Sequence, residues 1–410
     1  MASEWRRCTI ADLGDVITGK TPSTKISEFW DGSVHFVTPK DIQGLKHITD
    51  TERKITNIGL QKVKGSVLPP GAVCVSCIGN IGYTGMTTQQ CVSNQQINSI
   101  IVNENNDPDF VYYLMRSLWP FFKNYEGQST TLSILNKTQF SKIPVLVPDK
   151  NAQKKIAGVI SVLDSKIELN KKINDNLQQQ IKSLVTAWLV DYIPFGGEMP
   201  SNWCTISLAT IADFVSGYSY KGAELQPSTT AMATIKNFDR NGGFKLDGFK
   251  ELVPSSKIKP CHYAEKFDVI VAHTDLTQKA EVIGNAEPII NLSGYESIVF
   301  SMDLVKVLPK DTRVSKFLLA ALLQHPRFKA HCLGYVNGTT VLHLSKKALP
   351  DYELDFPTDP AVLVPLDDAL RVLYMQMATI VDENRKLQDL RDTLLPRLMS
   401  GQIDVTDIDF

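Results

Sequence analysis

Two stretches of the chain repeat apolar residues in alternating steps of four and three, the spacing of a coiled-coil seam. They run over residues 156–188 and 366–398, and a shift of 210 residues superimposes them. The predicted seam positions are Ile156, Ile160, Leu163, Ile167, Asn174, Leu177, Ile181 and Leu184 in the first stretch, and Leu366, Leu370, Leu373, Met377, Ile380, Asn384, Leu387, Leu394 and Leu398 in the second. Asn170, Trp188 and Arg391 fill the remaining steps. We predict two long helices packed on each other; a bundle inside an ordinary globular core is the alternative.

Polar residues occur within both seams. Asn174 and Asn384 occupy the same seam position, because they are 210 residues apart. A buried asparagine in a coiled coil is a known means of fixing helix register. We therefore expect these two asparagines to specify how the helices align.

Each seam follows a segment with the short apolar runs and alternations of β-strands, and these two segments are related. Trp5–Gly19 aligns with Trp203–Gly217 without a gap, and Ser129–Pro148 aligns with Gly338–Pro357. We predict an α+β protein in which two mixed α/β domains, here called heads, are related by an internal repeat and separated by two long helices that form an antiparallel coiled coil. The expected boundaries are 1–150 for the first head, 151–192 for the central helical spacer, 193–357 for the second head, 358–400 for the C-terminal helical spacer and 401–410 for a tail.

One short motif suggests a different chemistry. Gly14–Thr21 reads GDVITGKT and matches the phosphate-loop pattern G-x-x-x-x-G-K-[ST]. That motif needs a helix starting at the Lys-Thr pair, but Pro22 follows Thr21 and disfavours helical geometry there. The second copy of the repeat has Tyr218 and Ser219 at these two positions. We expect a glycine turn after a half-exposed strand, not a nucleotide site.

Composition narrows the class of protein. Of 410 residues, 43% are hydrophobic and 21% charged, as in ordinary globular proteins, and the net charge of −1 means that nucleic acid would have to bind to local basic patches. No apolar run has the length of a membrane span and the start of the chain has no signal-peptide core, so we expect a cytoplasmic protein. Cys74 and Cys77 form a lone C-x-x-C, which we expect to be buried strand residues on opposite faces; we expect no metal site.

Several segments together resemble the specificity subunit (HsdS) of type I restriction–modification systems. They read TGKTPST, FWDGSVHFVTPKDI, GNIGYTGM and LLPRLMSGQI, with AWLVDYIPFGGEMPSNW joining the first helix to the second head. The resemblance covers essentially the whole chain. It implies that each head is a target-recognition domain that reads one half of a split, asymmetric sequence in double-stranded DNA, and that the helices set the gap between the halves.

The resemblance also implies which partners and cofactors to expect. Two methyltransferase subunits would dock on the chain and methylate adenine N6 with S-adenosylmethionine, and restriction subunits would use ATP and Mg²⁺. The chain itself would have no catalytic residues and no cofactor, and no membrane would be involved.

Polar turns beside basic residues are where DNA contacts would arise. In the first head the candidates are Lys20, Thr21, Ser23, Lys25, Lys40, Gln43, Ser129, Thr130 and Thr131. In the second head they are Tyr218, Tyr220, Lys221, Lys236, Asn237, Arg240, Thr339 and Thr340. For each residue the alternative is a solvated loop position or a capping hydroxyl.

Two other functions remain open on the residues alone. A self-contained DNA methyltransferase is disfavoured, because the chain has neither the [DNS]-P-P-[YFW] motif of adenine methylases nor a glycine-rich cofactor loop. A stand-alone bipartite DNA-binding or scaffold protein would use the same heads, but it would bind DNA tightly without a methyltransferase partner.

Overall fold

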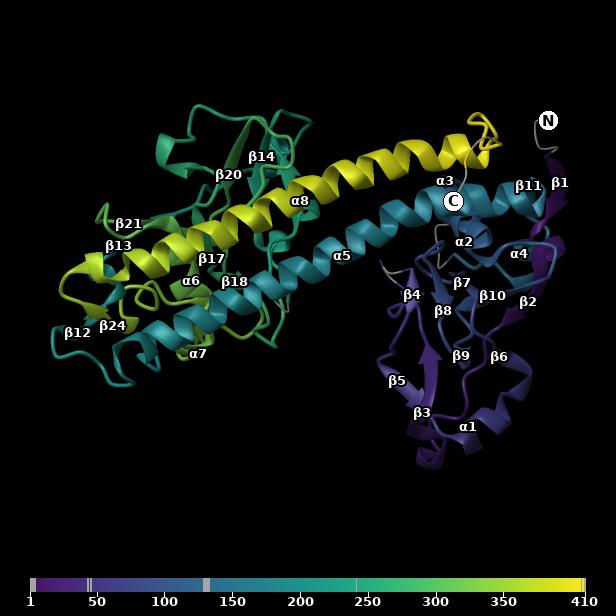
Figure 1. Ribbon diagram of the computed structural model, residues 1–410, viewed down its shortest axis with the longest axis horizontal. Coiled ribbons are helices and arrows are strands. Elements are labelled where there is room, and N and C mark those ends of the chain that lie inside the picture. Colours follow the sequence, from purple (N-terminus) through teal and green to yellow (C-terminus); the bar gives the residue numbers. More distant parts are fainter. Residues whose placement is uncertain are drawn as a thin grey trace. The chain divides into compact units, whose positions relative to one another are not determined.

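The chain folds into two compact units. The computed structural model describes residues 5–42, 44, 46–127, 133–240, 242–406 and 408. Unit 1 consists of Met1–Ile167 and Lys386–Phe410, and unit 2 of Glu168–Arg385. The long helices α5 (Lys150–Leu189) and α8 (Val364–Met399) contribute to both units (Figure 1).

Unit 1 contains the first head. Strand β1 (Arg6–Thr9) pairs antiparallel with β11 (Pro144–Val147) (Figure 1). A five-stranded sheet follows the order β2 (Gly14–Thr18), β10 (Ile97–Val102), β7 (Val73–Ser76), β8 (Thr84–Thr87) and β4 (His47–Ile48). A second sheet follows the order β5 (Arg53–Ile55), β3 (Trp30–Val37), β9 (Cys91–Ser93) and β6 (Val67–Leu68). The shorter helices are α1 (Asn57–Lys62), α2 (Pro108–Ser117), α3 (Trp119–Gly127) and α4 (Lys137–Ser141).

Unit 2 contains the second head, whose strands follow the same plan. Strand β12 (Trp203–Ser207) pairs antiparallel with β24 (Glu353–Pro357). One sheet has the order β13 (Ala212–Ser216), β21 (Leu304–Pro309), β17 (Val269–Ala272) and β19 (Ala286–Pro288). Another has the order β15 (Lys250–Glu251), β14 (Thr230–Ala233), β20 (Ser297–Phe300) and β16 (Tyr263–Ala264). A small sheet joins β18 (Thr274–Asp275), β23 (Leu342–Leu344) and β22 (Val336–Asn337), and the shorter helices are α6 (Lys316–Gln324) and α7 (Pro326–Leu333).

The internal repeat is therefore present in the topology as well as in the sequence. In each head a four-stranded sheet has one central parallel pair, β3 with β9 and β14 with β20, flanked by antiparallel partners. Mixed pairing in the same order on both sides of a repeat confirms the expected fold of two related α/β heads.

The glycine that ends each repeated strand has the same packing role in both heads. A Cβ atom at Gly19 would lie 2.1 Å from the carbonyl oxygen of Asn94, and one at Gly217 would lie 2.0 Å from that of Ser301. Only glycine allows the backbone to approach so closely. Strand β2 runs antiparallel to β10, and no helix begins at Lys20 or Thr21. The phosphate-loop match thus falls on a strand and a tightly packed turn.

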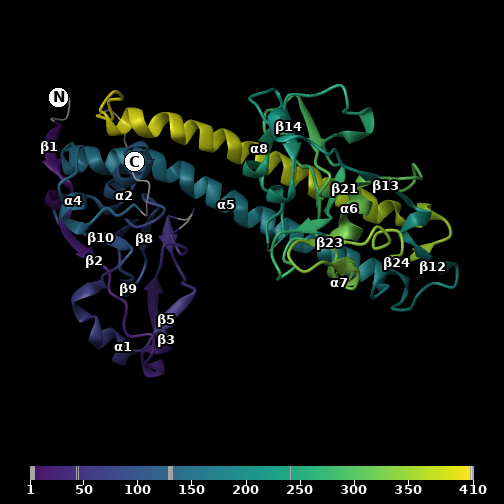
Figure 2. The same ribbon diagram turned by 180° about the vertical axis from the view of Figure 1, so that it is seen from behind.

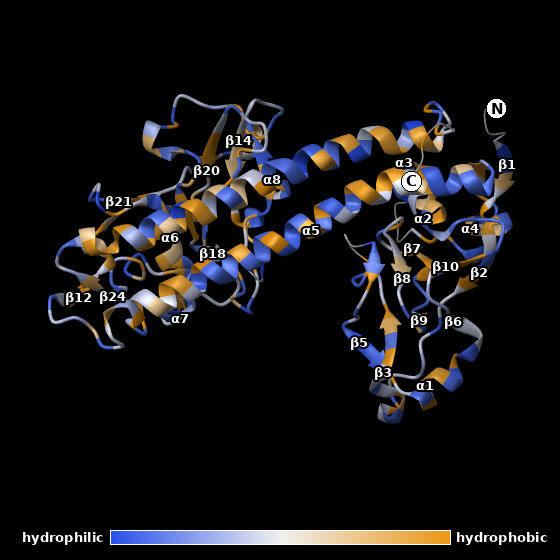
Figure 3. Cartoon of the chain, viewed as in Figure 1, coloured by the Kyte–Doolittle hydropathy of each residue, from blue (hydrophilic) through white to orange (hydrophobic). Residues whose placement is uncertain are grey.

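Helices α5 and α8 run antiparallel in both units. In unit 1, Asp164 pairs with Arg391, and in unit 2, Asn170 pairs with Asn384. Apolar and polar residues alternate along both helices (Figure 3). None of the predicted seam residues is exposed, because they pack against the facing helix or the adjacent head.

The asparagines of the seam do not behave alike. Nδ2 of Asn170 donates to Oδ1 of Asn384 (2.9 Å) and to Oε2 of Glu383 (2.7 Å). In an antiparallel pair, four residues further along α5 correspond to four residues back on α8, so Asn174 lies level with Ile380. Its buried Oδ1 has no hydrogen-bond partner among the described residues. Asn170, not Asn174, is therefore the partner of Asn384, because positions 210 residues apart do not in general face each other in an antiparallel helix pair.

Described residues near the two ends of the sequence belong to one core in unit 1. Gly401 packs against the indole of Trp5, and Nζ of Lys155 donates to the carbonyl oxygen of Thr406 at 2.6 Å. Strand β1 and the last turns of α8 lie near the first turns of α5 in the two opposite views (Figures 1 and 2). Val405, which follows α8, is 3% exposed and belongs to the same core as α2 and the start of α5.

Candidate nucleic-acid interface

The loop after Gly19 presents several of the candidate residues of the first head. Lys20, Ser23 and Lys25 are exposed, whereas Thr21 is half-buried and its hydroxyl donates to Oε1 of Gln95 at 2.5 Å. The backbone here is irregular rather than helical. The lysines and Ser23 can reach a ligand, while Thr21 is occupied in holding the loop.

A second candidate loop lies between β3 and β4. The carboxylate of Asp41 accepts hydrogen bonds from the backbone nitrogen (2.7 Å) and hydroxyl (2.6 Å) of Thr38, which closes a turn. Lys40 projects from this turn and its Nζ lies 3.4 Å from Oε2 of Glu52, with both side chains largely exposed. An exposed ion pair of this kind is weak, so Lys40 can exchange it for a phosphate. Four candidates lie outside the described residues: Gln43, Ser129, Thr130 and Thr131.

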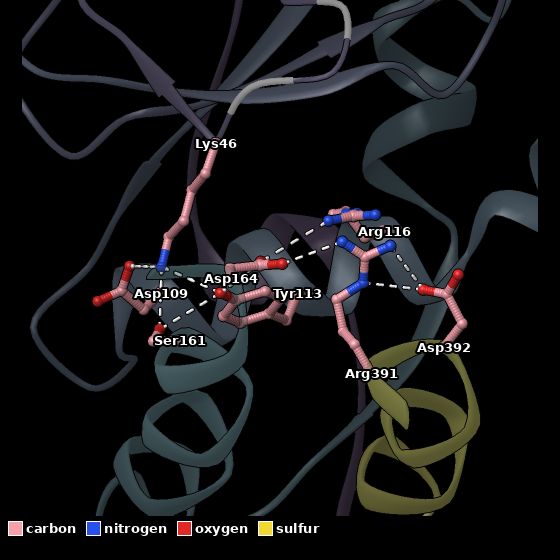
Figure 4. A network of polar contacts seen from close by, with 8 residues as sticks. All are labelled: Lys46, Asp109, Tyr113, Arg116, Ser161, Asp164, Arg391 and Asp392. Atoms are coloured by element: carbon pink, nitrogen blue, oxygen red, sulfur yellow. Dashed lines mark hydrogen bonds and ion pairs between the residues drawn. The ribbon is translucent and has the colours of Figure 1, made fainter. Parts of the chain in front are cut away.

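The same loop is anchored to the helices by a buried lysine. Lys46 is 8% exposed, and its Nζ lies 2.7 Å from Oδ1 of Asp109, 3.0 Å from Oγ of Ser161 and 3.3 Å from the hydroxyl of Tyr113 (Figure 4). Asp109 and Tyr113 belong to α2, and Ser161 belongs to α5. Lys46 therefore positions the loop that carries Lys40 and is itself too buried to contact DNA.

The network continues from Tyr113 to α8. The hydroxyl of Tyr113 donates to Oδ2 of Asp164 at 2.8 Å, and burial raises the pKa of Tyr113, which keeps this donor protonated. Asp164 also accepts from Arg391 at 3.0 Å and lies 3.8 Å from Arg116 (Figure 4). Hydrogen bonds thus connect a candidate DNA loop, α2, α5 and α8 within unit 1.

In the second head, basic residues line a pocket of about 340 Å³. Lys236, Arg240 and Lys245 are all exposed and contribute to its wall. Nε of Arg240 lies 3.4 Å from Oε2 of Glu281, and Nζ of Lys245 lies 4.0 Å from Oδ2 of Asp239. These pairs are exposed enough for the cations to bind a polyanion instead.

A loop beside this pocket connects it to the two candidate threonines. Leu276 and Thr277 line the pocket, and the side-chain amide of Gln278 donates to the carbonyl oxygen of Thr339. Thr339 and Thr340 are exposed. The structure therefore brings four candidates, Lys236, Arg240, Thr339 and Thr340, to neighbouring loops of one head.

Other candidates of the second head have structural roles. Asn237 is fully buried: its Oδ1 accepts from the backbone of Thr234 and its Nδ2 donates to the carbonyl oxygen of Lys245, both at 2.8 Å. Tyr218 is 5% exposed, and its hydroxyl contacts Glu224 and Ser255 at 2.9 Å. In this conformation neither side chain can meet a duplex. Their polar groups suggested DNA contacts in the sequence, but here these groups hold turns together.

Two further candidates of the second head are neither buried nor part of the pocket. Tyr220 is half-buried, with Nζ of Lys250 5.7 Å from the centre of its ring, and Lys221 is exposed. Neither lines the basic pocket.

The cysteines belong to the apolar core. Cys74 and Cys77 are 0% and 2% exposed and fall in different core clusters, as opposite strand faces require. Burial raises their pKa to about 11 and about 12, so both are thiols at neutral pH. The described residues include no group of three or more His, Cys, Asp or Glu side chains suited to a metal ion. No helix in the described part of the chain has the length and apolar composition needed to cross a membrane.

Comparisons with known proteins identify the family. The family description "Type I restriction modification DNA specificity domain" matches residues 2–179. The MjaIX type I specificity subunit of Methanocaldococcus jannaschii is 25% identical over 99% of this chain and 95% of its own length. The HindI specificity subunit of Haemophilus influenzae is 32% identical over 42% of this chain and 39% of its own length. The S subunit from M. genitalium has the same fold, with a TM-score of 0.53, 16% identity and coverage of 97% and 96%.

The chain belongs to the specificity subunits of type I restriction–modification systems. It is accordingly the DNA specificity subunit, the non-catalytic part of such a complex. This assignment agrees with the repeated heads and paired helices described above.

Sequence reasoning missed three residues of this specificity subunit that the structure places near the candidate loops: Lys46, Lys245 and Leu276. Lys46 and Lys245 differ from other lysines only by their three-dimensional surroundings, so composition gives no signal for them. Leu276 lies between Asp275 and Thr277 in a polar stretch. A leucine isolated in a polar loop is a signal that could have been used.

Proposed function

We propose that this specificity subunit reads a bipartite, asymmetric target in double-stranded DNA, with one half-site for each head. The observation that carries the proposal is the combination of one topology with two different loop surfaces. Both heads share the order of the mixed four-stranded sheet and of the first four strands of the other large sheet. The first head presents Lys20, Lys25 and Lys40, whereas the second presents a pocket with Lys236, Arg240, Lys245 and Leu276. Equal scaffolds with unequal loops suit a target whose two halves have different sequences.

We further propose that two methyltransferase subunits dock on the chain and methylate adenine N6 with S-adenosylmethionine, and that restriction subunits supply ATP- and Mg²⁺-dependent activity. The complex would work in the cytoplasm, where its DNA substrate lies. One surface feature supports paired docking: Val162 on α5 and Val372 on α8, which are 210 residues apart, are 59% and 63% exposed. The two positions are equivalent in the repeat, and two copies of one partner would meet equivalent residues.

Methylation mapping of chimeric complexes tests this function. The chain is co-expressed with its cognate methyltransferase in a host without other adenine methylases, and N6-methyladenine is located by long-read sequencing. One split motif is expected. Replacing residues 1–150 with the corresponding segment of a relative should change one half of the motif and leave the other half unchanged.

Two controls separate the alternatives. The chain expressed alone should give no methylation, and a methyltransferase with an inactivated catalytic site should give none with the chain. A change in both halves of the motif after exchange of one head would refute modular reading. Tight sequence-specific binding by the lone chain, without any methylation in the complex, would instead favour a stand-alone DNA-binding protein.

A further inference from the structure

Leu276 is an exposed apolar residue on a well-supported loop. Its side chain is 67% exposed, the highest value for a large hydrophobic residue among those that the structure describes. The preceding residue, Asp275, is 2% exposed and accepts hydrogen bonds from Thr277 N (2.8 Å), Thr277 Oγ1 (2.9 Å), Val282 N (2.8 Å) and Ile283 N (3.3 Å). Burial opposes the charge of Asp275, but these bonds lower its pKa, so the carboxylate stays ionised. These hydrogen bonds therefore fix the loop in a conformation that leaves the side chain of Leu276 exposed to solvent.

Three cationic side chains lie around Leu276 and suit a polyanion. Lys236, Arg240 and Lys245 line the same 340 Å³ pocket, together with Asp247 and with Asp275, whose carboxylate accepts the hydrogen bonds of the loop. Lysine and arginine side chains in the wall of a pocket can bind phosphates, which positions a duplex but does not read its sequence. Sequence is read by groups that reach base edges.

The first head has a polar residue at the equivalent loop tip. The bridge between Ile78 and Ile134 in the first head corresponds to the pairing of Thr274 with His343 in the second. Ile134 aligns with His343 in the repeat, and Ile78 and Thr274 each lie two residues after β7 and β17, which are both third in their sheets. Counting two residues on from the bridge, Asn80 corresponds to Leu276. Asn80 is exposed. The two heads thus present different chemistry at one equivalent position.

We propose that Leu276 contacts the 5-methyl group of a thymine in the second half-site and thereby contributes to the specificity of that half. An aliphatic side chain cannot form hydrogen bonds, and the thymine methyl is the apolar group that base edges offer in the major groove. Lys236, Arg240 and Lys245 bind the flanking phosphates and hold the loop at the groove. The inference rests on the proposed function. If an adenine of the second half-site is methylated, that half-site contains at least one A·T pair and therefore a thymine.

Replacing thymine by deoxyuridine tests the contact, because this removes only the methyl group. The split motif is first established by methylation mapping, and the complex with the methyltransferase is then titrated with duplexes carrying one deoxyuridine at each thymine position in turn. One substitution in the second half-site should weaken binding about four-fold, the effect expected for one buried methyl group. In the Leu276→Ala complex, binding to the thymine duplex should weaken and this deoxyuridine penalty should disappear.

Matched variants give the controls. Leu333→Ala removes another exposed leucine (45% exposed), on α7 and outside the pocket, and should leave every affinity and the deoxyuridine penalty unchanged. Asn80→Ala should weaken binding through the first half-site and keep the penalty in the second. Because Leu276 is exposed, its replacement should not alter the melting temperature of the chain.

Three results would overturn the inference. The first is a second half-site in which no deoxyuridine weakens binding. The second is a penalty that persists in Leu276→Ala, which would assign the methyl contact to another residue. The third is an equal loss of affinity for all duplexes together with loss of DNA bending, which would make Leu276 a wedge between base pairs. In each case the methylation motif itself would stand, so failure of this inference is distinct from failure of the proposed function.

Discussion

Leucine substitutions at Asn170 and Asn174 should change stability in opposite directions. The two residues lie one helical turn apart on the same seam of α5 in unit 2. Asn170 is 1% exposed and donates two hydrogen bonds, whereas the buried Oδ1 of Asn174 has no partner among the described residues. An argument based only on sequence position would treat them alike, because both are asparagines in a coiled-coil seam.

The expected magnitudes follow from these contacts. Asn170→Leu removes a neutral hydrogen bond worth about 1 kcal/mol and one to a carboxylate worth about 2 kcal/mol, and leaves Oδ1 of Asn384 without this donor. The unpaired Oδ1 of Asn384 costs about 1 kcal/mol more and burial of the leucine returns about 2 kcal/mol, so the net loss is about 2 kcal/mol. Asn174→Leu replaces an unsatisfied acceptor, which costs about 1–3 kcal/mol when buried, and adds apolar contact at the level of Ile380. The variant should be more stable by about 1–2 kcal/mol.

Differential scanning calorimetry of the full chain measures both effects. For a unit of this size, 1 kcal/mol corresponds to about 2–4 °C, so the transition of unit 2 should fall by about 4–8 °C for Asn170→Leu and rise by about 2–8 °C for Asn174→Leu. Gln179→Leu, on the exposed face of the same helix, controls for the added leucine and should change little. Shifts of the same sign at positions 170 and 174 would refute the register assigned to the two helices.

Two further predictions concern buried ionisable groups. Lys46→Met should destabilise unit 1 by about 1–2 kcal/mol in chemical denaturation, since its partner Asp109 is half exposed and part of the loss is screened. Lys40→Met, whose pair with Glu52 is exposed, should have almost no effect. Equal effects of the two substitutions would contradict the anchoring role of Lys46. Burial raises the pKa of Glu287 from 4.5 to about 7, although its carboxylate accepts hydrogen bonds from the backbone nitrogen of Gly243 and from Nε2 of Gln324. The folded state then binds this proton more tightly than the unfolded state, so the stabilisation is complete below about pH 4.5 and is lost as the pH rises through about 7. Relative to Glu287→Gln, the wild type should therefore lose about 2–3 kcal/mol over this range in melting curves recorded at each pH, and parallel pH profiles would contradict it.

The helices and the repeat could be predicted from the sequence because many weak signals agree over long distances. The seam predicted two long helices in contact, and the structure has α5 and α8 packed antiparallel in each unit. Packing of the seam depends on the identity of every third or fourth residue, which the sequence states directly. The register between the helices depends instead on which asparagine finds a partner, and here sequence equivalence pointed to Asn174 where the structure has Asn170.

The candidate interface was less predictable because exposure and hydrogen bonding decide which polar side chains are available. Lys236 and Asn237 are neighbours in sequence and were equally plausible, but Lys236 is exposed on the pocket whereas Asn237 is fully buried within the turn. Polar residues in turns serve either the backbone or a ligand. Which of the two they serve depends on contacts such as that of Asn237 with Lys245, eight residues away.

The unequal chemistry of the two heads has a structural counterpart in the seam. A protein with exact twofold symmetry would have the same residue at every pair of positions 210 apart, yet Asn170 corresponds to Ile380 and Asp164 to Tyr374. In unit 1 the Asp164 position holds a charged network with Arg391, whereas in unit 2 the Tyr374 hydroxyl donates to Gln324 at 2.6 Å within an apolar cluster. Each head is therefore joined to the helices by its own set of contacts, and a head placed against the other head's helical segments would leave Asp164 or Tyr374 without its partner. Exchange of heads between relatives should succeed when the segment ends where α5 begins, at residue 150, and should retain function best when the donor keeps the partners of Asp164.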